Sequence, residues 1–454
     1  MWRTQPIVFF LLLGLSIPKA KGNCKYIESQ LHCVCSLAGR ADFQNYLSCL
    51  AAETYELRGG NLEHFQTFSG LKPSPPMIDI LRALQVKRLV FTDVLIPEIL
   101  LPGALEFVSY APLVSELKFT NCTFLNPVPW SYTGGLDLRV PSLCLHRVVA
   151  APLGGRLGTF GLGRWLRSLE NLTVTESQVT SVPCATGKMF SSLHFLDLSG
   201  NRFQEQGIAS SFCEGAFPQL QILKLQRNSL TSYGAACQAL SRLQALTHLD
   251  LSQNHFLPED SSSHCSWPAS LRIFNLSNTG LEHMDRSLPR NVEILDLSAN
   301  KMLTLDLSIP SLKELYLSNN SLQAVPSVDE LPGLKVLSLD QNQLSHLPLK
   351  ALLRLEHLQS LKAGHNLFNC SCRNYITDIQ GLAAKPSLLQ GWPREYLCSS
   401  PPNYQTQQVA EVPLPSLQCN KARISHGSLI TLLLCLHLAC ALLPTPLSSH
   451  ISSS

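Results

Sequence analysis

The sequence has few charged residues and almost no charge imbalance. Only 15% of its 454 residues are Asp, Glu, Lys or Arg, and the formal net charge is +3. Proteins that bind nucleic acids or other polyanions usually carry a stronger positive excess, so the composition argues against that class of partner. The low charge does not indicate disorder, because 45% of the residues are hydrophobic and can form a sizeable core.

The sequence also lacks the motifs that mark several enzyme classes. It contains no G-x-S-x-G and no H-E-x-x-H, and neither G-K-S nor G-K-T follows the glycine-rich stretch 154–163. A nucleophile elbow, a zinc-protease helix and a phosphate-binding loop are therefore not predicted. The histidines, such as His146 and His248, are scattered and are expected to be solvated. We predict that the protein is not an enzyme and has no catalytic residues, cofactor or metal site.

No apolar run reaches the roughly 20 residues that a membrane-spanning helix needs. At the start, Arg3 precedes the apolar run 7–15 and small residues follow it, which predicts a signal peptide over residues 1–22. Near the end, the apolar run 429–443 has 15 residues, and no Lys or Arg follows it. A removable lipid-anchor signal, with attachment at Asn420, is favoured over a short membrane span, and both alternatives remain open.

Cysteine, in contrast, is abundant. The chain has 16 cysteines, and an exported protein with so many is expected to form disulfide bonds. The Cys-x-Cys spacings invite a metal-binding interpretation, but zinc sites favour wider ligand spacing, so disulfides are preferred. Cys435 and Cys440 fall in the apolar run near the end, and Cys122 and Cys144 stand apart from three groups of cysteines. These groups are Cys24, Cys33, Cys35 and Cys49 at the front; Cys184, Cys213, Cys237 and Cys265 in the middle; and Cys370, Cys372, Cys398 and Cys419 at the back.

An internal repeat dominates the rest of the sequence. Residues 334–344 match L-x-x-L-x-L-x-x-N-x-L, which is the leucine-rich repeat, and residues 193–203 match it with Phe203 in the last position. Because one repeat cannot bury its own leucines, neighbouring repeats must stack, each supplying one short strand. The predicted fold class is therefore an α/β solenoid, a leucine-rich-repeat horseshoe with a parallel β-sheet on its concave face and disulfide caps at both ends. The template fits, at a mean spacing of about 25 residues, from Val86, Val114, Val140, Leu169, Leu193, Leu220, Leu246, Leu271, Val292, Leu312, Leu334 and Leu358.

The asparagine of the template is expected to satisfy the turning backbone from inside the coil. It is present as Asn201, Asn228, Asn254, Asn300, Asn320, Asn342 and Asn366. In the repeat that starts at Val114 a cysteine takes this place, so we predict that Cys122 is a buried, reduced thiol. Cys144 falls between two core leucines and should lie on the concave face. Repeats before Leu271 average about 26 residues and those after Val292 average 22, so the earlier repeats have more room for convex helices, and curvature should change between them.

Five N-x-S/T sequons are candidate glycosylation sites in an exported chain. They lie at Asn121, Asn171, Asn275, Asn319 and Asn369. Asn275 falls between two core residues of a repeat strand, so it should project from the concave face. A glycan at this position would obstruct a ligand that runs along the middle of that face.

The segment 43–84, which precedes the first regular repeat, is rich in apolar residues. It is either an ordinary hydrophobic cap core with solvated charges, or an apolar pocket with a basic rim, suited to acyl chains on a phosphorylated head group. The second interpretation assigns ligand binding to Phe43, Leu47, Leu50, Phe65, Phe68, Met77, Ile80, Leu81 and Leu84. It assigns the basic rim to Arg58, Lys72, Arg82, Lys87 and Arg88.

Several motifs around this segment resemble a known family. These motifs are C-V-C at 33–35, D-F-x-x-Y-L-x-C at 42–49, G-G-N-L-E-H-F at 59–65 and L-R-A-L-Q-V-K-R-L at 81–89. Their order is similar to that in the monocyte differentiation antigens, the lipopolysaccharide co-receptors of the leucine-rich-repeat family. The resemblance implies an N-terminal lipid pocket, a lipid anchor, and lipopolysaccharide-binding protein and Toll-like receptors as partners.

The C-terminal cysteines, together with W-P at 392–393, resemble the cap of Toll-like receptors, which the mammalian co-receptors lack. The two resemblances imply the pairs Cys184–Cys213, Cys237–Cys265, Cys370–Cys398 and Cys372–Cys419. At the front we predict Cys24–Cys35 and Cys33–Cys49, one of three possible connectivities. The predicted divisions after the signal peptide are an N-terminal cap at 23–85, repeats at 86–368, a C-terminal cap at 369–419, and a spacer with an anchor signal at 420–454.

These features together predict a cell-surface co-receptor of innate immunity that is not an enzyme. It would bind bacterial lipopolysaccharide, lipopeptides and other acylated ligands and pass them to Toll-like receptors. Nucleic acid is not expected as a partner, whereas a homodimer and a secreted form both fit the sequence. The alternative is an extracellular adhesion or decoy protein that binds protein partners on its concave face, although such a protein has no need of an apolar cavity in its cap.

Overall fold

The computed structural model describes most of the repeats and parts of both caps. The described residues are 23–37, 49, 51–62, 75–97, 105, 108–125, 138–149, 163–258, 265–283, 288–327, 329–385 and 387–414. The signal peptide predicted at 1–22, the attachment residue Asn420 and the apolar run 429–443 lie outside these ranges. Among the described residues, no helix has the length and apolar character needed to cross a bilayer.

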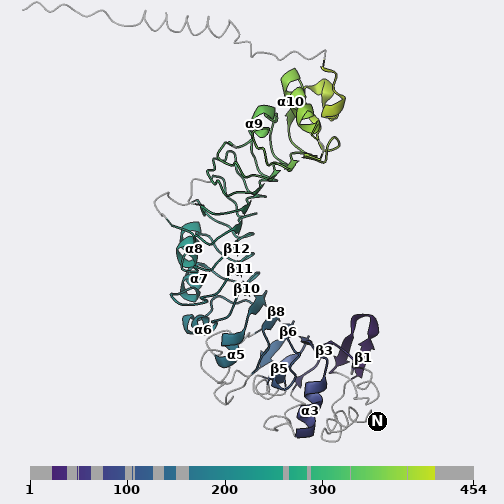
Figure 1. Ribbon diagram of the computed structural model, residues 1–454, viewed down its shortest axis with the longest axis vertical. Coiled ribbons are helices and arrows are strands. Elements are labelled where there is room, and N and C mark those ends of the chain that lie inside the picture. Colours follow the sequence, from purple (N-terminus) through teal and green to yellow (C-terminus); the bar gives the residue numbers. More distant parts are fainter. Residues whose placement is uncertain are drawn as a thin grey trace, which may run out of the picture.

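A 16-stranded sheet runs the length of the molecule and lines the inner side of its curve (Figure 1). The first two strands pair antiparallel, and every later pairing is parallel. All twelve predicted repeat starts lie two residues before a strand of this sheet, so the predicted fold class is confirmed. In spatial order the strands are β1 (Asn23–Ile27), β2 (His32–Ser36), β3 (Thr54–Arg58), β4 (Arg88–Thr92), β6 (Glu116–Thr120), β8 (Ser142–His146), β9 (Asn171–Thr175), β10 (Phe195–Asp197), β11 (Ile222–Lys224), β12 (His248–Asp250), β13 (Ile273–Asn275), β14 (Ile294–Asp296), β15 (Glu314–Tyr316), β16 (Val336–Ser338), β17 (Ser360–Lys362) and β19 (Leu389–Gln390).

The strands are short because only their central residues face the core. In β12, Leu249 is buried, while His248 and Asp250 on either side are half-buried on the concave face. The template leucines on each side, Leu246 and Leu251, are also buried. Full burial of one such side chain stabilises the fold by about 1.5–3 kcal/mol. The resulting core is continuous from the first repeat to the C-terminal cap, so each repeat is stabilised by its two neighbours.

Helices lie on the outer side of the curve, and their positions follow repeat length (Figure 1). The longer repeats carry α5 (Gly163–Ser168), α6 (Cys184–Met189), α7 (Glu205–Ser211) and α8 (Tyr233–Leu240). The described residues between 241 and 348 contain no helix, and α9 (Leu349–Leu352) is the next. The expectation that longer repeats have room for convex helices is therefore confirmed, whereas the change in curvature stays a prediction.

A ladder of buried side chains satisfies the turning backbone, as the template predicts. Asn300 Nδ2 donates to the carbonyl oxygens of Leu276 and Leu297, both at 2.9 Å. Its Oδ1 accepts from the backbone nitrogens of Thr279 at 3.0 Å and Leu281 at 3.1 Å, which belong to the preceding repeat. Each asparagine therefore fastens two repeats together.

Other residues fill the same place in the remaining repeats. Thr279 is buried and donates its hydroxyl to the Leu276 carbonyl at 2.7 Å. Cys122 is buried, is not in a disulfide, and places its Sγ 3.4 Å from the carbonyl oxygens of Phe91 and Thr120. Cys144 is also reduced and half-buried, at the expected concave position in β8.

Disulfide bonds join cysteines in the caps and in the middle of the solenoid. The described residues form Cys24–Cys35, Cys33–Cys49, Cys184–Cys213, Cys237–Cys265 and Cys370–Cys398, which are five of the six predicted pairs. Cys372 is disulfide-bonded too, and its predicted partner Cys419 lies outside the described residues. Three cap sulfurs lie within 4.8 Å of one another, but all belong to cysteines already joined in disulfides, so their closeness does not indicate a metal site.

The C-terminal cap closes the solenoid with α10 (Arg373–Ala383) and the pair β18 (Phe368–Asn369) and β20 (Cys398–Ser400). Tyr396 is fully buried there, and its hydroxyl accepts from Ala363 N at 3.1 Å. Burial raises the pKa of this hydroxyl, so it stays neutral. Smaller elements are η1 (Glu28–Gln30), α3 (Pro75–Ala83), the pair β5 (Leu95–Pro97) and β7 (Thr123–Leu125), η4 (Pro402–Tyr404) and η5 (Val409–Glu411).

Candidate functional site

The N-terminal end of the solenoid contains the described part of the predicted lipid pocket. Leu81 is buried at 7% exposure, and Leu84 is half-buried against the core of the repeats. Met77 and Ile80 belong to the same helix, α3, although their side chains are not among those described. The predicted pocket residues outside the described ranges are Phe43, Leu47, Leu50, Phe65 and Phe68, as is the rim residue Lys72.

Local sequence explains why α3 forms at this point. Two prolines begin it, which suits the first turn, because the backbone N–H groups there have no partner within the helix. The apolar residues at 77, 80, 81 and 84 follow helical spacing in the sequence, and Asp79 and Arg82 are exposed. Leu84, one residue after the end of α3, packs against the repeat core, so α3 lies between the pocket segment and the first regular strand.

Three of the four described rim residues are paired with carboxylates. Arg58 Nη2 lies 2.7 Å from Glu56 Oε1, and Lys87 Nζ lies 2.7 Å from Glu53 Oε1. Arg82 forms a looser pair with Asp79, at 3.8 Å within the helix. Arg88, exposed at the start of β4, has no ion pair among the described residues. The pairings partly neutralise the predicted rim and leave Arg88 as its unpaired cation in the described segment.

A buried carboxylate beside this rim was not predicted. Glu56 lies in β3 at 5% exposure, and its Oε2 is 3.1 Å from His32 Nε2 of the neighbouring β2. Burying a charge is costly unless it is paired, so the contacts with His32 and Arg58 explain how Glu56 is tolerated. In the sequence, the alternation of Thr54, Glu56 and Arg58 along one face of a strand could have indicated that Glu56 is paired with a cation.

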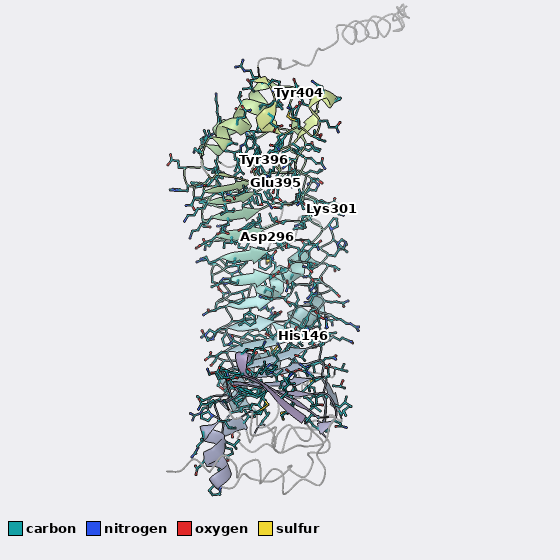
Figure 2. All side chains as sticks on the ribbon, turned by 90° about the vertical axis from the view of Figure 1, so that its right-hand side faces the viewer. His146, Asp296, Lys301, Glu395, Tyr396 and Tyr404 are labelled. Atoms are coloured by element: carbon teal, nitrogen blue, oxygen red, sulfur yellow. A yellow bond between two sulfur atoms is a disulfide. The ribbon has the colours of Figure 1, made fainter. Side chains whose placement is uncertain are left out.

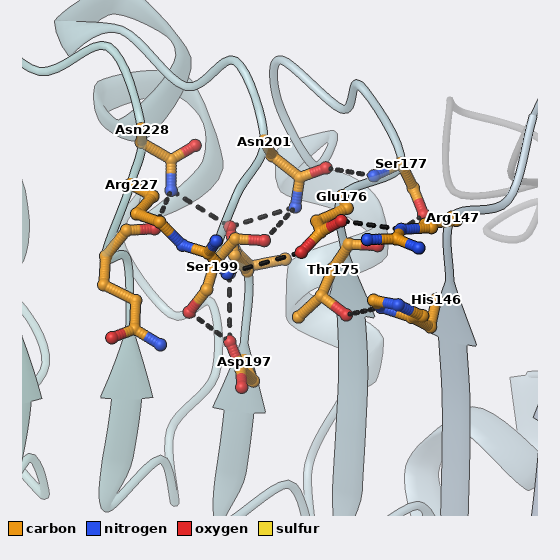
Figure 3. Close-up of polar contacts among 12 residues, drawn as sticks. His146, Arg147, Thr175, Glu176, Ser177, Asp197, Ser199, Asn201, Arg227 and Asn228 are labelled. Carbon is orange, nitrogen blue, oxygen red and sulfur yellow. Dashed lines mark hydrogen bonds and ion pairs between the residues drawn. The ribbon is translucent and has the colours of Figure 1, made fainter. Parts of the chain in front are cut away.

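A second polar cluster lies further along the sheet, at the edge where the strands end (Figure 3). Arg147 Nε donates to Glu176 Oε2 at 2.8 Å, and Arg227 Nη2 lies 3.4 Å from Glu176 Oε1. The hydrogen bond from Arg147 lowers the pKa of the Glu176 carboxyl, with help from the nearby positive charges. Below it, His146 Nδ1 lies 2.9 Å from Thr175 Oγ1, so His146 is hydrogen-bonded rather than simply solvated.

The five sequons fall at different positions on the described surface. Asn121 and Asn319 are exposed and hold left-handed backbone conformations at the strand-end edge. Asn171 and Asn275 lie in β9 and β13 on the concave face, and both are half-buried. Asn369 is half-buried at the end of the last repeat. Glycosylation at these sites stays a prediction.

Models of repeat families match the chain at two places. A leucine-rich-repeat model covers residues 310–368, and a second one covers residues 192–214. The chain is a leucine-rich-repeat protein. The matched residues include clear copies of the template, and between them they span strands β10, β15, β16 and β17.

This leucine-rich-repeat protein is similar to Toll-like receptor 2 of several animals. It is 33% identical to the receptor of Mus musculus over 394 residues, which are 85% of this chain and 49% of the receptor. It is 33% identical to that of Macaca mulatta over 357 residues, 77% of this chain and 45% of the receptor. The Toll-like receptor 2 type-2 of Gallus gallus is 31% identical over 362 residues, 78% of this chain and 44% of the receptor. The chain spans about half the length of these relatives.

Among solved structures, this leucine-rich-repeat protein is similar to one from Leptospira interrogans. The TM-score is 0.49 at 20% sequence identity, over 78% of this chain and 87% of that one. The finer resemblance to lipopolysaccharide co-receptors stays a prediction.

Proposed function

We propose that this protein is a pattern-recognition co-receptor at the cell surface, which binds bacterial lipopolysaccharide and other acylated ligands near its N-terminal end. It passes them to a Toll-like receptor and performs no catalysis of its own. The observation that carries the proposal is the similarity to Toll-like receptor 2, which extends over 85% of the chain. The disulfides support an exported protein, because such bonds persist in oxidising compartments.

The ligand site in this proposal is the segment 43–84 with its basic rim. Acyl chains would gain about 0.8 kcal/mol for each buried methylene group, so an apolar pocket of modest size suffices for tight binding. The burial of Leu81 and the packing of Leu84 against the repeat core support an apolar floor for such a pocket. Arg88, whose charge is not balanced by a described carboxylate, is the residue best placed to attract a phosphate.

The partners in this proposal follow from the family resemblance. Lipopolysaccharide-binding protein delivers the ligand, a Toll-like receptor receives it, and the protein is held at the membrane by a lipid anchor or a short span. In this proposal the boundary after residue 85 separates the ligand segment from the repeats, and the boundary after residue 368 separates the repeats from the C-terminal cap. Dimerisation is compatible with the proposal but is not required by it.

Native mass spectrometry of the purified protein, after incubation with a bacterial lipid extract, tests the proposal directly. The parent protein should retain acylated species, whereas a protein with both Leu50→Asp and Phe65→Asp should not. Leu303→Asp is the matched control, because Leu303 is 45% exposed on a repeat far from the N-terminal end. Folding of each variant is checked by its thermal unfolding and secretion.

A well-folded Leu50→Asp, Phe65→Asp protein that retained lipid as the parent does would overturn the proposed pocket. The same result would return segment 43–84 to its simpler role as a cap core. Binding of a protein partner in place of lipid would favour an adhesion or decoy function.

A further inference from the structure

The middle of the concave face carries a row of mainly apolar side chains. Parallel pairing places one residue of each strand from β10 to β14 next to its counterpart in the following strand. Each of these side chains is half-buried, while the residue that follows it is buried. We call this set the apolar row: Phe195, Ile222, His248, Ile273 and Ile294.

His248 is the one polar member of the row, and its Nδ1 lies 2.7 Å from Thr247 Oγ1, so it is hydrogen-bonded rather than simply solvated. Burial lowers the pKa of its imidazole, so the ring is neutral at pH 7. Strands lie roughly 4.8 Å apart, which makes the row about 19 Å long across its five strands. A continuous apolar strip of this length on a soluble protein usually marks a surface that something covers.

A second row runs beside the apolar row and is rich in carboxylates. Asp250 and Asp296 flank Asn275 in the strand pairing, and neither has an ion pair among the described residues. Each carboxylate accepts a hydrogen bond from the backbone nitrogen two residues later, at 2.9 Å. Asn275 Oδ1 accepts the same bond from Ser277 N, also at 2.9 Å. Figure 2 views this face directly, with Asp296 labelled near its middle.

Only one of the two polar atoms of the Asn275 amide is therefore hydrogen-bonded. Its oxygen is held by Ser277 N, whereas its Nδ2 makes no hydrogen bond with any described residue. Asn275, Leu276 and Ser277 form a sequon, and Nδ2 is the atom that an N-linked glycan modifies. Asn121 differs, because its Nδ2 donates to Asp93 Oδ1 at the strand-end edge.

We propose that Asn275 carries an N-linked oligosaccharide and that this oligosaccharide, rather than a protein partner, covers the apolar row. The donor is an oligosaccharide linked to a polyprenyl diphosphate. Nδ2 bonds to the anomeric carbon of the first sugar, and the bond from that carbon to the diphosphate oxygen breaks. The diphosphate leaves with the electron pair, and Nδ2 loses one proton, so no oxidant or reductant is needed.

The surroundings of Asn275 suit a covering sugar chain. Ile273 lies two residues away on the same face of β13, and Ile294 lies diagonally across on β14, so both are within reach of the first sugars. Sugar rings present apolar C–H faces, which bury the apolar row, and hydroxyl groups, which donate to Asp250 and Asp296. A cationic protein segment would also suit these carboxylates, but the attached sugar occupies the same space permanently.

Substitutions at Ser277 test the proposal without disturbing the sheet. Ser277→Ala destroys the sequon, whereas Ser277→Thr preserves it, and the backbone hydrogen bond to Asn275 survives in both. The full chain is expressed in cells that perform N-glycosylation. Glycopeptide mass spectrometry then measures occupancy at Asn275, and carbene footprinting measures the accessibility of Ile273 and Ile294 relative to Leu303.

We expect a glycan at Asn275 in the parent and in Ser277→Thr, with low labelling of Ile273 and Ile294. Ser277→Ala should lose the glycan and show several-fold more labelling of both residues, with Leu303 unchanged. If Ser277→Ala is not secreted, enzymatic removal of the glycan from the folded parent gives the same comparison. That treatment leaves Asp at position 275, the residue that the neighbouring strands already carry.

Two results would overturn the proposal. The first is an unmodified Asn275 in the secreted parent protein, which would leave the apolar row open to a partner. The second is an occupied Asn275 whose removal leaves the labelling of Ile273 and Ile294 unchanged, since the glycan would then point away from the row.

Discussion

Gly200 lies against the side chain of Glu176 from the preceding repeat. The Glu176 carboxylate in turn contacts Arg227, two repeats further along the chain (Figure 3). A Cβ atom at Gly200 would be 2.8 Å from Glu176 Cγ, which is closer than atoms of this kind approach. The contact between Glu176 and Arg227 therefore depends on the absence of a side chain at position 200.

Gly200→Ala should destabilise the protein for two reasons. Its backbone has φ +68°, a left-handed conformation that costs an alanine about 1 kcal/mol. The new methyl group also forces Glu176 to rotate away from Arg227. Chemical denaturation of the parent, Gly200→Ala, Glu176→Ala and the double variant separates these effects, because the penalty should be smaller when Glu176 is already absent. Equal penalties in both backgrounds would show that the contact is unimportant.

Asn300→Asp should be among the most damaging single substitutions in the repeats. An aspartate would turn a second acceptor oxygen toward the carbonyls of Leu276 and Leu297, which now receive the Asn300 amide. Removing such buried hydrogen bonds costs about 3 kcal/mol or more. Asn278→Asp is the matched control, because Asn278 is exposed at the edge of the preceding repeat. The midpoint of urea unfolding should fall for the first variant and stay near the parent value for the second.

Asp340 should make the protein less stable in acid. Burial alone would raise the pKa of its carboxyl, but hydrogen bonds from Ser318, Ser338 and Lys362 outweigh burial and lower it. A lowered pKa stabilises the fold above the unfolded value of about 3.9, and this stability is lost as pH falls through the folded value. Asp340→Asn should therefore be less stable than the parent at pH 7, and the difference in unfolding free energy should narrow toward about pH 3. A constant difference would contradict this assignment.

The two neighbouring cations of the basic rim should differ in their effect on ligand binding. Lys87 is balanced by Glu53, whereas Arg88 has no ion pair in the described part of the chain. Arg88→Glu should weaken binding of phosphorylated lipids by at least about fivefold, corresponding to ~1 kcal/mol, and Lys87→Glu should weaken it less. Surface-plasmon resonance at low and high salt provides the measurement, with the larger loss at low salt because exposed charges are screened. A larger effect at Lys87 would show that its pairing with Glu53 does not persist in the complex.

The repeat architecture was predictable because it follows from the spacing of residues that are close together in the sequence. Leucines at fixed offsets predict a strand in every repeat, and a strand of the 16-stranded sheet begins two residues after each of the twelve predicted starts. The role of Cys122 in the ladder was predictable for the same reason, since it occupies the asparagine position. Thr279 occupies that position too, and the same count of residues from Leu271 would have found it.

Contacts between distant repeats were not predictable. Glu176 and Arg227 are 51 residues apart, and Lys87 and Glu53 are 34 apart, so their pairing follows only from how the strands stack. The basic rim was predicted from closeness in sequence, which identified cations without revealing their carboxylate partners. The apolar row was missed for a similar reason, because its members come together only when five strands are aligned.

The asparagine ladder also has a mechanical consequence. Each ladder residue forms hydrogen bonds only with its own repeat and the preceding one. A force applied to the two ends of the molecule would therefore unfold the repeats one at a time instead of breaking the whole sheet at once. Cys184–Cys213 and Cys237–Cys265 join cysteines that are 29 and 28 positions apart, and the segments between them cannot be extended while the disulfides are intact. Under tension the coil would therefore extend around these two closed loops, which are separated by the extensible segment 214–236.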